Sequence, residues 1–309
     1  MDVQFKKHFM KLISKKTELN FGKKILLNEK LANYSWFNLG GPSEVLFKPD
    51  SVEDIISFLK ESKPESINIL GAGSNTLIRD GGVKGIIIKL SSHFSYLNLI
   101  SDNIIEAGAA TLDRKISNFA LEQSLTGLEF LSCIPGSLGG AIRMNSGCYG
   151  GDISQILHSI KVVDIFGNEK NIPASEINFS YRGCNLDQNL IITSVKLKGK
   201  PHSKEKIQKK QQDLIERKKN SQPNQVKTCG STFKNTKDKK AWELIKKSNC
   251  QNLQVGSAKI SEKHCNFFVN DGKATAKELE DLINKVKETV YQKTKINLEL
   301  EIKIIGSNN

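Results

Sequence analysis

Long hydrophobic runs are absent from this sequence of 309 residues, of which 38% are hydrophobic. A membrane-spanning helix needs about 20 consecutive apolar residues, and no segment approaches that length. The first twenty residues place lysines between single apolar side chains, whereas a signal peptide requires an unbroken apolar core of about 7–15 residues. The composition also excludes disordered, collagen-like and disulfide-scaffold proteins. We therefore expect a cytoplasmic globular protein that does not associate with membranes.

Cysteine forms no metal-binding or disulfide pattern. The six cysteines include no Cys-x-x-Cys pair, and none lies at ligand spacing from a histidine. His264 is adjacent to Cys265, but two side chains alone do not make a zinc site. Without a secretion signal, free and mostly buried thiols are expected. The sequence therefore predicts no bound metal.

Arginine is scarce: the chain has 41 lysines but only five arginines. The net charge of +13 is concentrated in residues 200–247, which carry 15 basic and five acidic residues. Such a run is either a solvated helix face or a source of attraction for an anionic ligand. Proteins that recognise bases or clamp phosphates favour arginine, so the composition argues against a nucleic-acid partner. Where an arginine does occur, a position that requires a guanidinium becomes more plausible.

The chain contains a mixture of short predicted strands and helices. At roughly 100–200 residues per domain, its length predicts two domains. The elements do not alternate strictly as in a doubly wound fold, so we expect an α+β protein. Ser51 and Thr111 are expected to cap the helices that follow them. The predicted helices cover 3–16, 52–62, 112–124, 203–219, 239–247 and 275–292, and the predicted strands cover 67–70, 85–90, 104–107, 159–165, 169–172, 190–198, 266–270 and 297–305.

Two glycine-rich segments interrupt these elements. In the first, Ile69–Thr76, a predicted strand leads into glycines that allow backbone N–H groups to approach an anion. Thr76 stands where a third glycine would complete the Rossmann fingerprint, so a plain turn fits the segment equally well. The second, Ile134–Asn145, has three glycines within five positions, which fits either N–H groups facing a ligand or a tightly packed kinked loop. Together they favour a dinucleotide whose pyrophosphate is held by loops.

A set of motifs in one order makes the sequence recognisable. It resembles the UDP-N-acetylenolpyruvoylglucosamine reductases, the MurB family, over about residues 29–306. No single motif is specific, but their combination is. The motifs are Phe37-Asn38-Leu39-Gly40-Gly41-Pro42, GAGSNTLIRDGG over 71–82, IPGSLGGAIRMNSGCYGG over 134–151, Tyr181-Arg182, Gly230–Asn235, SEKHCNF over 261–267 and EIKIIG over 301–306.

The resemblance implies an FAD-binding fold of the vanillyl-alcohol-oxidase (PCMH) type, followed by a smaller α+β substrate-binding domain. We expect the FAD-binding domain over 29–202, with two subdomains that divide near residue 93. The C-terminal domain is expected over 203–309, with its final strand returning to the active site. Residues 1–28 are expected to form an N-terminal helical extension.

The activity implied by the resemblance is reduction of the enolpyruvyl group on UDP-N-acetylglucosamine to a lactyl group. This NADPH-dependent reaction yields UDP-N-acetylmuramate, a precursor of bacterial peptidoglycan. FAD would be bound non-covalently, with NADPH as co-substrate. The implied partners are therefore small molecules, with a nucleotide sugar as substrate, and we expect a monomer.

The resemblance also assigns site residues. The implied catalytic positions are Arg182, Ser231 and Glu301. Because they directly follow the serine motif, Lys234 and Asn235 are expected to bind substrate phosphate or sugar. The implied flavin-binding positions are Gly71, Ala72, Gly73, Ser74 and Asn75 in the first glycine segment, and Pro135, Gly136, Ser137, Gly139, Gly140 and Ala141 in the second.

The reaction explains why these residue types suit the site. Hydride addition to the enolpyruvyl group builds negative charge, which spreads into the neighbouring carboxylate as an enolate. Arg182 offers that carboxylate two parallel hydrogen bonds. Ser231 is a weak acid, but an enolate is basic enough to take its proton, and Gly230 lets the backbone approach the substrate. Glu301, on the final predicted strand, would hold a proton when poorly solvated near an anion and share in stabilising the enolate. Hydride chemistry has no need of His264, for which we expect a packing role.

The sequence departs from the family pattern at a few small side chains. Thr236 replaces the proline that usually follows the serine motif, Ser146 and Cys148 replace alanines, and Cys265 replaces another alanine. These changes affect packing more than chemistry. The short spacing between the catalytic arginine and serine resembles the shorter type of the family, which lacks an extra loop whose tyrosine closes over the nucleotide.

Two rival functions are open at this level. An FAD oxidase of the same fold often tethers its flavin covalently, and His93 or Cys133 are conceivable anchors. That function leaves the catalytic arginine, serine and glutamate without a joint role. A nucleic-acid-binding module centred on 200–247 would have only Phe233 and Trp242 for base stacking.

Overall fold

The structure is a computed structural model that describes residues 12–62, 64 and 67–308. The chain forms two compact units, and each unit is assembled from three separate segments. The expected mixture of helices and short strands is present in both. The first unit contains residues 1–29, 44–72 and 85–216, and the second contains residues 30–43, 73–84 and 217–309.

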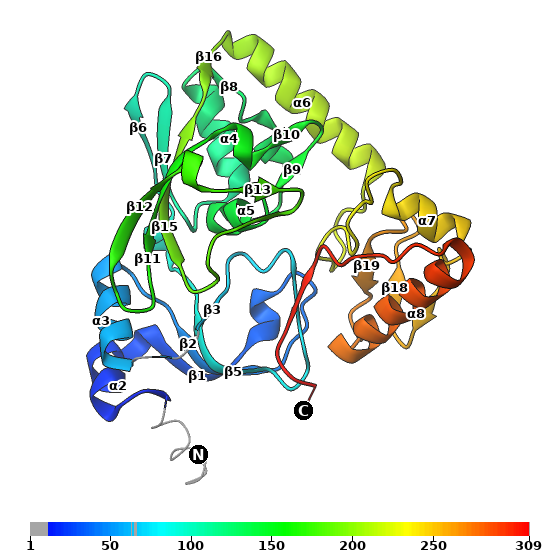
Figure 1. The fold of residues 1–309 in the computed structure, drawn as a ribbon, viewed down its shortest axis with the longest axis horizontal. Helices are drawn as coiled ribbons and strands as arrows, with labels where there is room; N and C mark the ends of the chain where they lie inside the picture. The colour runs from blue at the N-terminus through cyan, green and yellow to red at the C-terminus, as the bar shows by residue number, and fades with distance from the viewer. Residues whose placement is uncertain (1–11, 63, 65–66, 309) are drawn as a thin grey trace. The chain divides into compact units, whose positions relative to one another are not determined.

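A four-stranded sheet with the order β1-β2-β5-β3 forms one layer of the first unit (Figure 1). Three phenylalanines join this sheet to its helices: Phe47 stacks on Phe58 with ring centroids 3.9 Å apart, and Phe21 contacts both edge-on. The predicted helix over 3–16 lies largely outside the described residues. The elements of this layer are α2 (Lys15–Phe21), β1 (Ile25–Lys30), β2 (Pro42–Phe47), α3 (Val52–Ser62), β3 (Ile67–Ile69) and β5 (Val83–Ile88).

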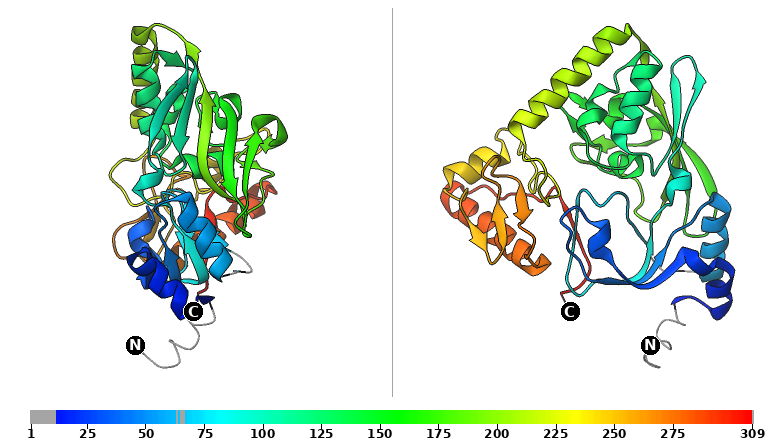
Figure 2. Two further views of the ribbon diagram at one scale, coloured as in Figure 1. Left: turned by 90° about the vertical axis from the view of Figure 1, so that its left-hand side faces the viewer. Right: turned by 180° about the vertical axis from the view of Figure 1, so that it is seen from behind.

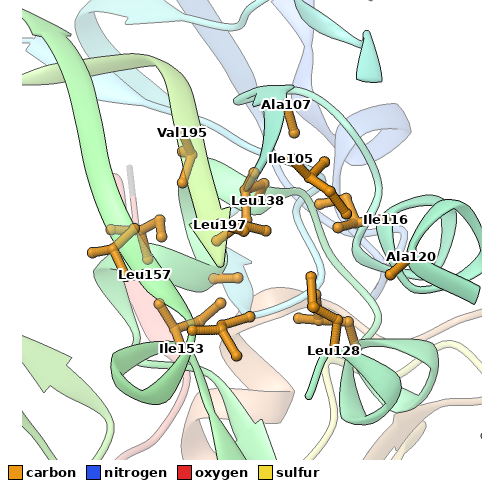
Figure 3. Packing of buried hydrophobic residues seen from close by; sticks show 14 of the residues in the cluster. Ile105, Ala107, Ile116, Ala120, Leu128, Leu138, Ile153, Leu157, Val195 and Leu197 are labelled. Carbon is orange, nitrogen blue, oxygen red and sulfur yellow. The ribbon is translucent and has the colours of Figure 1, made fainter. Parts of the chain in front are cut away.

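A second, five-stranded antiparallel sheet of this unit has the order β12-β11-β15-β7-β6. Figure 3 shows Ile105 from β7, Ile116 from α4 and Leu197 from β15 in one apolar core between sheet and helices. Helix α6 joins this core through the buried Leu214. The elements are β6 (Leu97–Ser101), β7 (Ile104–Gly108), α4 (Asp113–Glu122), α5 (Leu138–Arg143), β11 (Leu157–Val163), β12 (Glu169–Pro173), β15 (Ile191–Lys198) and α6 (Lys204–Ser221).

Short strand pairs and 3-10 helices connect the larger elements, and all lie in the first unit except the 3-10 helix Leu31–Tyr34, which belongs to the second. They carry the loops in which several candidate site residues lie. The pairs are β8 (Leu125–Thr126) with β16 (Lys200–Pro201), β9 (Gly147–Cys148) with β10 (Gly151–Asp152), and β13 (Phe179–Ser180) with β14 (Gly183–Cys184). The 3-10 helices are Gly22–Lys24, Leu31–Tyr34, Ser92–Phe94, Glu129–Cys133, Ile153–Gln155 and Ala174–Glu176.

One of the two predicted helix caps is confirmed. Ser51 Oγ accepts a hydrogen bond from the N–H of Asp54 at 3.2 Å, which satisfies a free donor in the first turn of α3. The prediction for Thr111 is wrong, because α4 begins one residue later and Leu112 occupies the cap position. The Thr111 hydroxyl instead donates to the carbonyl oxygen of Tyr96 at 3.1 Å.

In the second unit, α8 packs against a three-stranded antiparallel sheet, β17-β18-β19, and α7 packs against α8 (Figure 2, yellow to red). Its core contains Phe233 and Phe268 together with Phe37 and Leu77 from the two early segments. A parallel pair, β4 with β20, joins one of those segments to the C-terminus. The elements are β4 (Thr76–Ile78), α7 (Ala241–Lys247), β17 (Gln254–Val255), β18 (Ala258–Ile260), β19 (Phe268–Asn270), α8 (Ala276–Thr294) and β20 (Lys303–Ile305).

The predicted final strand over 297–305 is only partly correct. Leu300 forms an isolated bridge with Phe233, and regular pairing begins at Lys303. Glu301 therefore lies in a bend rather than on a strand. The reason is a change of partner: the segment first runs beside residues 232–234 and then beside β4.

Candidate active site

The two glycine segments meet within the first unit. The N–H of Ala72 donates to Ser137 Oγ at 3.2 Å. A side chain on Gly71 would place its Cβ 2.7 Å from the same oxygen, so glycine lets the two segments approach closely without displacing Ser137. Residues 71 and 137 therefore lie together, as a shared pyrophosphate cradle requires.

The second glycine segment contains a short helix that the sequence did not predict, α5. The N–H of Gly139 donates to the carbonyl oxygen of Ala109 at 2.9 Å, and a Cβ on Gly139 would lie 3.3 Å from the Ala109 Cβ. A side chain at Gly139 would therefore crowd Ala109, the residue that follows β7. Around Gly140, by contrast, the nearest atom to an added Cβ is Ser137 Oγ at 3.9 Å. That open space is on the segment expected to approach a ligand.

Lys89 is a candidate cofactor contact that the sequence analysis missed. Its ammonium donates to the carbonyl oxygen of Gly71 at 2.5 Å. Burial lowers the pKa of Lys89, and the neighbouring Lys48 lowers it further. The sequence feature that could have identified Lys89 is its place at the end of the apolar run Ile86–Ile88. A half-buried cation beside two glycine segments suits a diphosphate, so the residues present fit FAD.

The rest of the first glycine segment, residues 73–75, belongs to the second unit. Gly73 has a φ of +69°, and an added Cβ would lie on the carbonyl oxygen of Tyr34, so packing alone requires glycine there. Strand β4 begins at Thr76, which agrees with the absence of a Rossmann helix. The Asn75 side chain donates to the backbone oxygen of Glu301 at 3.0 Å. Asn75 thus contacts a catalytic candidate directly.

Arg182 lies at the tip of the β13–β14 hairpin in the first unit, with a left-handed φ of +60°. Its guanidinium donates to the carbonyl oxygen of Gly147 at 2.9 Å and lies 5.0 Å from the centroid of the Tyr181 ring. A planar donor group is therefore held in place at the end of a tight turn.

Two residues that the sequence analysis missed support this hairpin. Asn145 is buried, and its side-chain amide donates to the carbonyl oxygen of Ser180 at 3.1 Å. Arg143 donates to the carbonyl oxygens of Leu186, Gln188 and Leu190 in the loop after the hairpin. Burial lowers the pKa of Arg143. The scarcity of arginine was the signal that could have identified this position.

Ser231 and Glu301 lie close together in the second unit. The N–H of Glu301 donates to the carbonyl oxygen of Thr232 at 2.8 Å, so the two candidates are on adjacent backbones. Gly230, with a φ of +79°, makes the turn into Ser231. On the other side, the buried Asn266 accepts from the N–H of Phe233 at 3.0 Å and donates to its carbonyl oxygen at 2.8 Å.

The remaining candidates also have contacts within the fold. Lys234 Nζ lies 3.7 Å from the carboxylate of Glu299. The Asn235 side chain accepts from the N–H of Ala241 at 3.0 Å at the start of α7. His264 Nδ1 accepts from the N–H of Asn266 at 3.2 Å, and burial lowers its pKa. A neutral histidine that orders the Asn266 turn fits the packing role expected for it.

The residues that would anchor a covalent flavin or stack on nucleic-acid bases lie in the following surroundings. His93 is an exposed side chain whose Nδ1 lies 3.2 Å from Asp50 Oδ1, and Cys133 is buried in the apolar core. Phe233, one of the two candidate stacking residues, is fully buried against Phe268. Across the described part of the chain, no helix has the length and hydrophobicity of a membrane span. Those same residues include no cluster of three or more potential metal ligands.

The catalytic candidates thus come from both units, with Arg182 in the first and Ser231 and Glu301 in the second. Comparison with known families matches two parts of the chain. Residues 43–171 match the model of an FAD binding domain, and residues 221–305 match that of the C-terminal domain of UDP-N-acetylenolpyruvoylglucosamine reductase. The first match spans both glycine segments, and the second spans the serine motif and Glu301.

Full-length relatives are similar over almost the whole chain. The UDP-N-acetylenolpyruvoylglucosamine reductase of Pelagibacter ubique is 45% identical over 91% of this chain and 95% of its own length. That of Anaplasma marginale is 43% identical over 90% of this chain and 92% of its own. The crystal structure of the Thermus caldophilus enzyme matches with a TM-score of 0.80 and 33% identity over 91% of this chain and 98% of its own. The fold is thus an FAD-binding domain of the vanillyl-alcohol-oxidase (PCMH) type with a smaller C-terminal domain, and the chain belongs to the UDP-N-acetylenolpyruvoylglucosamine reductase family.

Proposed function

We propose that this protein is a UDP-N-acetylmuramate dehydrogenase that reduces UDP-N-acetylglucosamine enolpyruvate with NADPH in peptidoglycan precursor synthesis. The observation that carries this function is the placement of a serine and a glutamate on adjacent backbones. Ser231 and Glu301 are joined through the 2.8 Å hydrogen bond from the Glu301 N–H to the Thr232 oxygen. A serine and a carboxyl group held together in this way suit protonation of an enolate.

Arg182 is proposed to bind the carboxylate of the enolpyruvyl group. Its guanidinium is already oriented by Gly147 and by the Tyr181 ring. A fixed cation at this position stabilises the charge that develops on the substrate during hydride addition. Loss of one such donor typically costs about 3–4 kcal/mol of barrier.

Ser231 is proposed to donate the proton to the enolate, and Glu301 to share in stabilising the negative charge. Lys234 and Asn235 are proposed substrate contacts for the phosphate or sugar. All four residues lie in the segments that match the C-terminal family model. Their backbone contacts support a rigid arrangement, which proton transfer over a short distance needs.

Gly71, Ala72, Ser137, Gly140 and Lys89 are proposed to hold the pyrophosphate of FAD. The remaining flavin-binding positions of the two glycine segments, as assigned from the family motifs, belong to the same proposal. When bound, FAD supplies the hydride relay between NADPH and the substrate. The role of the protein in that step is to hold the cofactor and to exclude water.

Four finer features are proposals that accompany this function. The domain boundaries are residues 1–28 for the extension, 29–202 for the FAD-binding domain with a division near 93, and 203–309 for the C-terminal domain. The enzyme belongs to the shorter type that lacks the extra tyrosine loop, as the spacing of Arg182 and Ser231 indicates. It acts as a monomer, and it acts in the cytoplasm.

The decisive experiment is an NADPH oxidation assay with and without UDP-N-acetylglucosamine enolpyruvate. We expect oxidation that depends on this substrate and yields one UDP-N-acetylmuramate per NADPH. Acid denaturation should leave yellow flavin in the supernatant, whereas a tethered flavin would precipitate with the protein. Equal NADPH oxidation with and without the substrate would contradict the proposed function.

A further inference from the structure

Arg79 lies in the continuation of the first glycine motif, outside the positions assigned to flavin binding. In the second unit, its Nε and Nη2 donate to the two carboxylate oxygens of Glu280 on α8, at 2.9 and 2.6 Å. Its Nη1 donates to the carbonyl oxygen of Gly306 at 3.0 Å. One guanidinium therefore joins α8 to the residue that follows β20.

The strand β20 is held at both of its ends. At its start, the N–H of Lys303 donates to the carbonyl oxygen of Asn75 at 2.9 Å. At its end, the N–H of Arg79 donates to the carbonyl oxygen of Ile305 at 3.0 Å. The parallel register with β4 lies between these two points. A slip of one residue would exchange the two faces of the strand.

Glu301 lies two residues before this strand, and its backbone is held on two sides. Its carbonyl oxygen accepts from Asn75, and its N–H donates to Thr232. The position of Glu301 relative to Ser231 therefore depends on where β20 is anchored.

We propose that Arg79, paired with Glu280, is a positioning residue that fixes the register of β20 and so places Glu301 beside Ser231. This inference rests on the proposed function of Glu301. The side chains of Arg79 and Glu280 are only 31% and 18% exposed, so solvent screens the pair less than it screens a surface ion pair.

The chemistry of the contact requires arginine rather than lysine. A guanidinium can bind both carboxylate oxygens and still donate to a third acceptor, whereas an ammonium is a point charge. The neighbouring Asp80 also contacts α8: its carboxylate accepts hydrogen bonds from the N–H groups of Ala276 and Lys277, at 3.0 Å each. In a chain with only five arginines, the use of one here supports a specific need.

The test compares Arg79→Met with Arg79→Lys and Glu280→Gln in the FAD-loaded protein. Lys277→Met is the matched control, since its ion pair with Asp281 is exposed on the same helix. Stopped-flow absorbance would follow flavin reduction by NADPH and flavin reoxidation by UDP-N-acetylglucosamine enolpyruvate separately. For Arg79→Met we expect a limiting reoxidation rate lowered about 10–100-fold, the effect of a small misplacement in an active site.

Several accompanying results separate positioning from general damage. Flavin content, the reduction rate and the substrate concentration at half-maximal reoxidation should stay near wild type in Arg79→Met. Arg79→Lys should recover part of the rate, Glu280→Gln should show a smaller loss, and Lys277→Met should match wild type. If Arg79→Met does not fold, Glu280→Gln alone still decides the question.

Wild-type reoxidation in Arg79→Met and Glu280→Gln, or an equal loss in both half-reactions, would overturn the inference. Glu301→Gln, measured in parallel, distinguishes this failure from a failure of the proposed function. A slow Glu301→Gln beside a fast Arg79→Met refutes only the positioning role. Absence of reoxidation in the wild-type protein refutes the function itself.

Discussion

The two residues that flank Gly230 lie in different surroundings. Cys229 is buried, its Sγ lies 3.5 Å from the carbonyl oxygen of Thr76, and burial raises the pKa of its thiol to about 12. Ser231 is only half-buried. Because a thiol with so high a pKa stays protonated and unreactive at neutral pH, the serine is the group of this segment that is suited to proton transfer.

Ser231→Ala removes the proposed proton donor with almost no change in volume. It should leave the fold, the flavin content and flavin reduction by NADPH near wild type. Reoxidation by the enolpyruvyl substrate should slow about 10²–10⁴-fold, the usual contribution of a general acid. Stopped-flow absorbance measures both steps on one sample.

Ser231→Cys provides the comparison for this prediction. A thiol can also give a proton, so part of the reoxidation rate should return, although the longer side chain misplaces the donor. If both half-reactions of Ser231→Ala run at the wild-type rate, the serine is not the donor, and Glu301 becomes the next candidate.

Asp113 gives the protein a pH dependence of stability. The side chain is fully buried, both carboxylate oxygens lack a hydrogen-bond partner among the described residues, and desolvation raises its pKa well above the usual value. The unfolded chain loses this proton above about pH 3.9 while the folded protein keeps it, so stability falls as the pH rises towards the folded pKa. Asp113→Asn should therefore raise Tm at pH 8 by at least about 2 °C.

Thermal unfolding between pH 5 and pH 8 checks the prediction for Asp113. The fall in Tm over this range should be smaller in Asp113→Asn than in wild type. The exposed Asp102 provides the matched control, and Asp102→Asn should leave the pH profile unchanged. Parallel profiles for wild type and Asp113→Asn would show that Asp113 does not carry the effect.

The motifs propose residues for the chemistry, but they do not identify the residues that hold those side chains in place. Ser231, Arg182 and Glu301 were assigned from local patterns. Lys89 and Arg143 were missed, because their partners are backbone carbonyl groups of segments distant in the sequence. Every residue has a backbone carbonyl group, so the sequence does not indicate which of them accepts a hydrogen bond. Only the fold reveals such a contact.

At the scale of elements, α5 contains two adjacent glycines with different surroundings. Gly140 has open space around an added Cβ, whereas Gly139 is packed against Ala109. Gly140→Val should therefore fold but purify with little FAD, if its open side faces the pyrophosphate. Gly139→Val should instead lower stability by about 1–3 kcal/mol through overpacking.

Two measurements distinguish the variants: flavin absorbance per mole of protein, and thermal unfolding of the apoprotein. The expected pattern is a normal apoprotein Tm without flavin for Gly140→Val, and a lowered Tm for Gly139→Val. A full complement of FAD in Gly140→Val would refute the assignment of this glycine to the cofactor.

Long periodic elements were predictable from the sequence, and so were some short strands: 67–70 is found at Ile67–Ile69 and 104–107 at Ile104–Gly108. The final strand was predicted less well. Helix α8 was expected over 275–292 and is found at Ala276–Thr294, because its apolar spacing spans many turns. Strand β20 has only three residues, and its neighbours before Lys303 are irregular. Its pairing depends on a partner from another part of the chain, so periodicity alone overestimates its length.

At the scale of the whole molecule, neither unit is a continuous piece of chain. The second unit needs the segments 30–43 and 73–84 in addition to residues 217–309. Phe37 and Leu77, from the two early segments, are fully buried in its core. Each such side chain contributes about 1.5–3 kcal/mol on burial.

A fragment of residues 203–309 should therefore not fold alone, although it contains the proposed C-terminal domain. It lacks Phe37, Leu77 and the whole of β4, so its apolar core and the edge of β20 would be left open. We expect no cooperative thermal transition and poor dispersion of its amide NMR signals. Co-expression with residues 1–202 should restore both properties.

A sharp thermal transition of the isolated fragment would show that the early segments are dispensable for the core. Deletion of residues 12–24 from the full chain is a useful comparison. It removes α2 and Phe21 from the first unit only, so the unfolding of the second unit should be affected less than in the fragment.

The pairing of β4 with β20 also constrains how the protein is made. Residues 76–78 leave the ribosome long before their partners at 303–305, which lie 227 positions later in the chain. Closing so long a loop is slow, and until then the edge of β4 is open to chaperones or to aggregation. A premature stop codon anywhere before residue 303 would remove the partner strand entirely. Truncated products of this gene should therefore be degraded rather than retain partial activity.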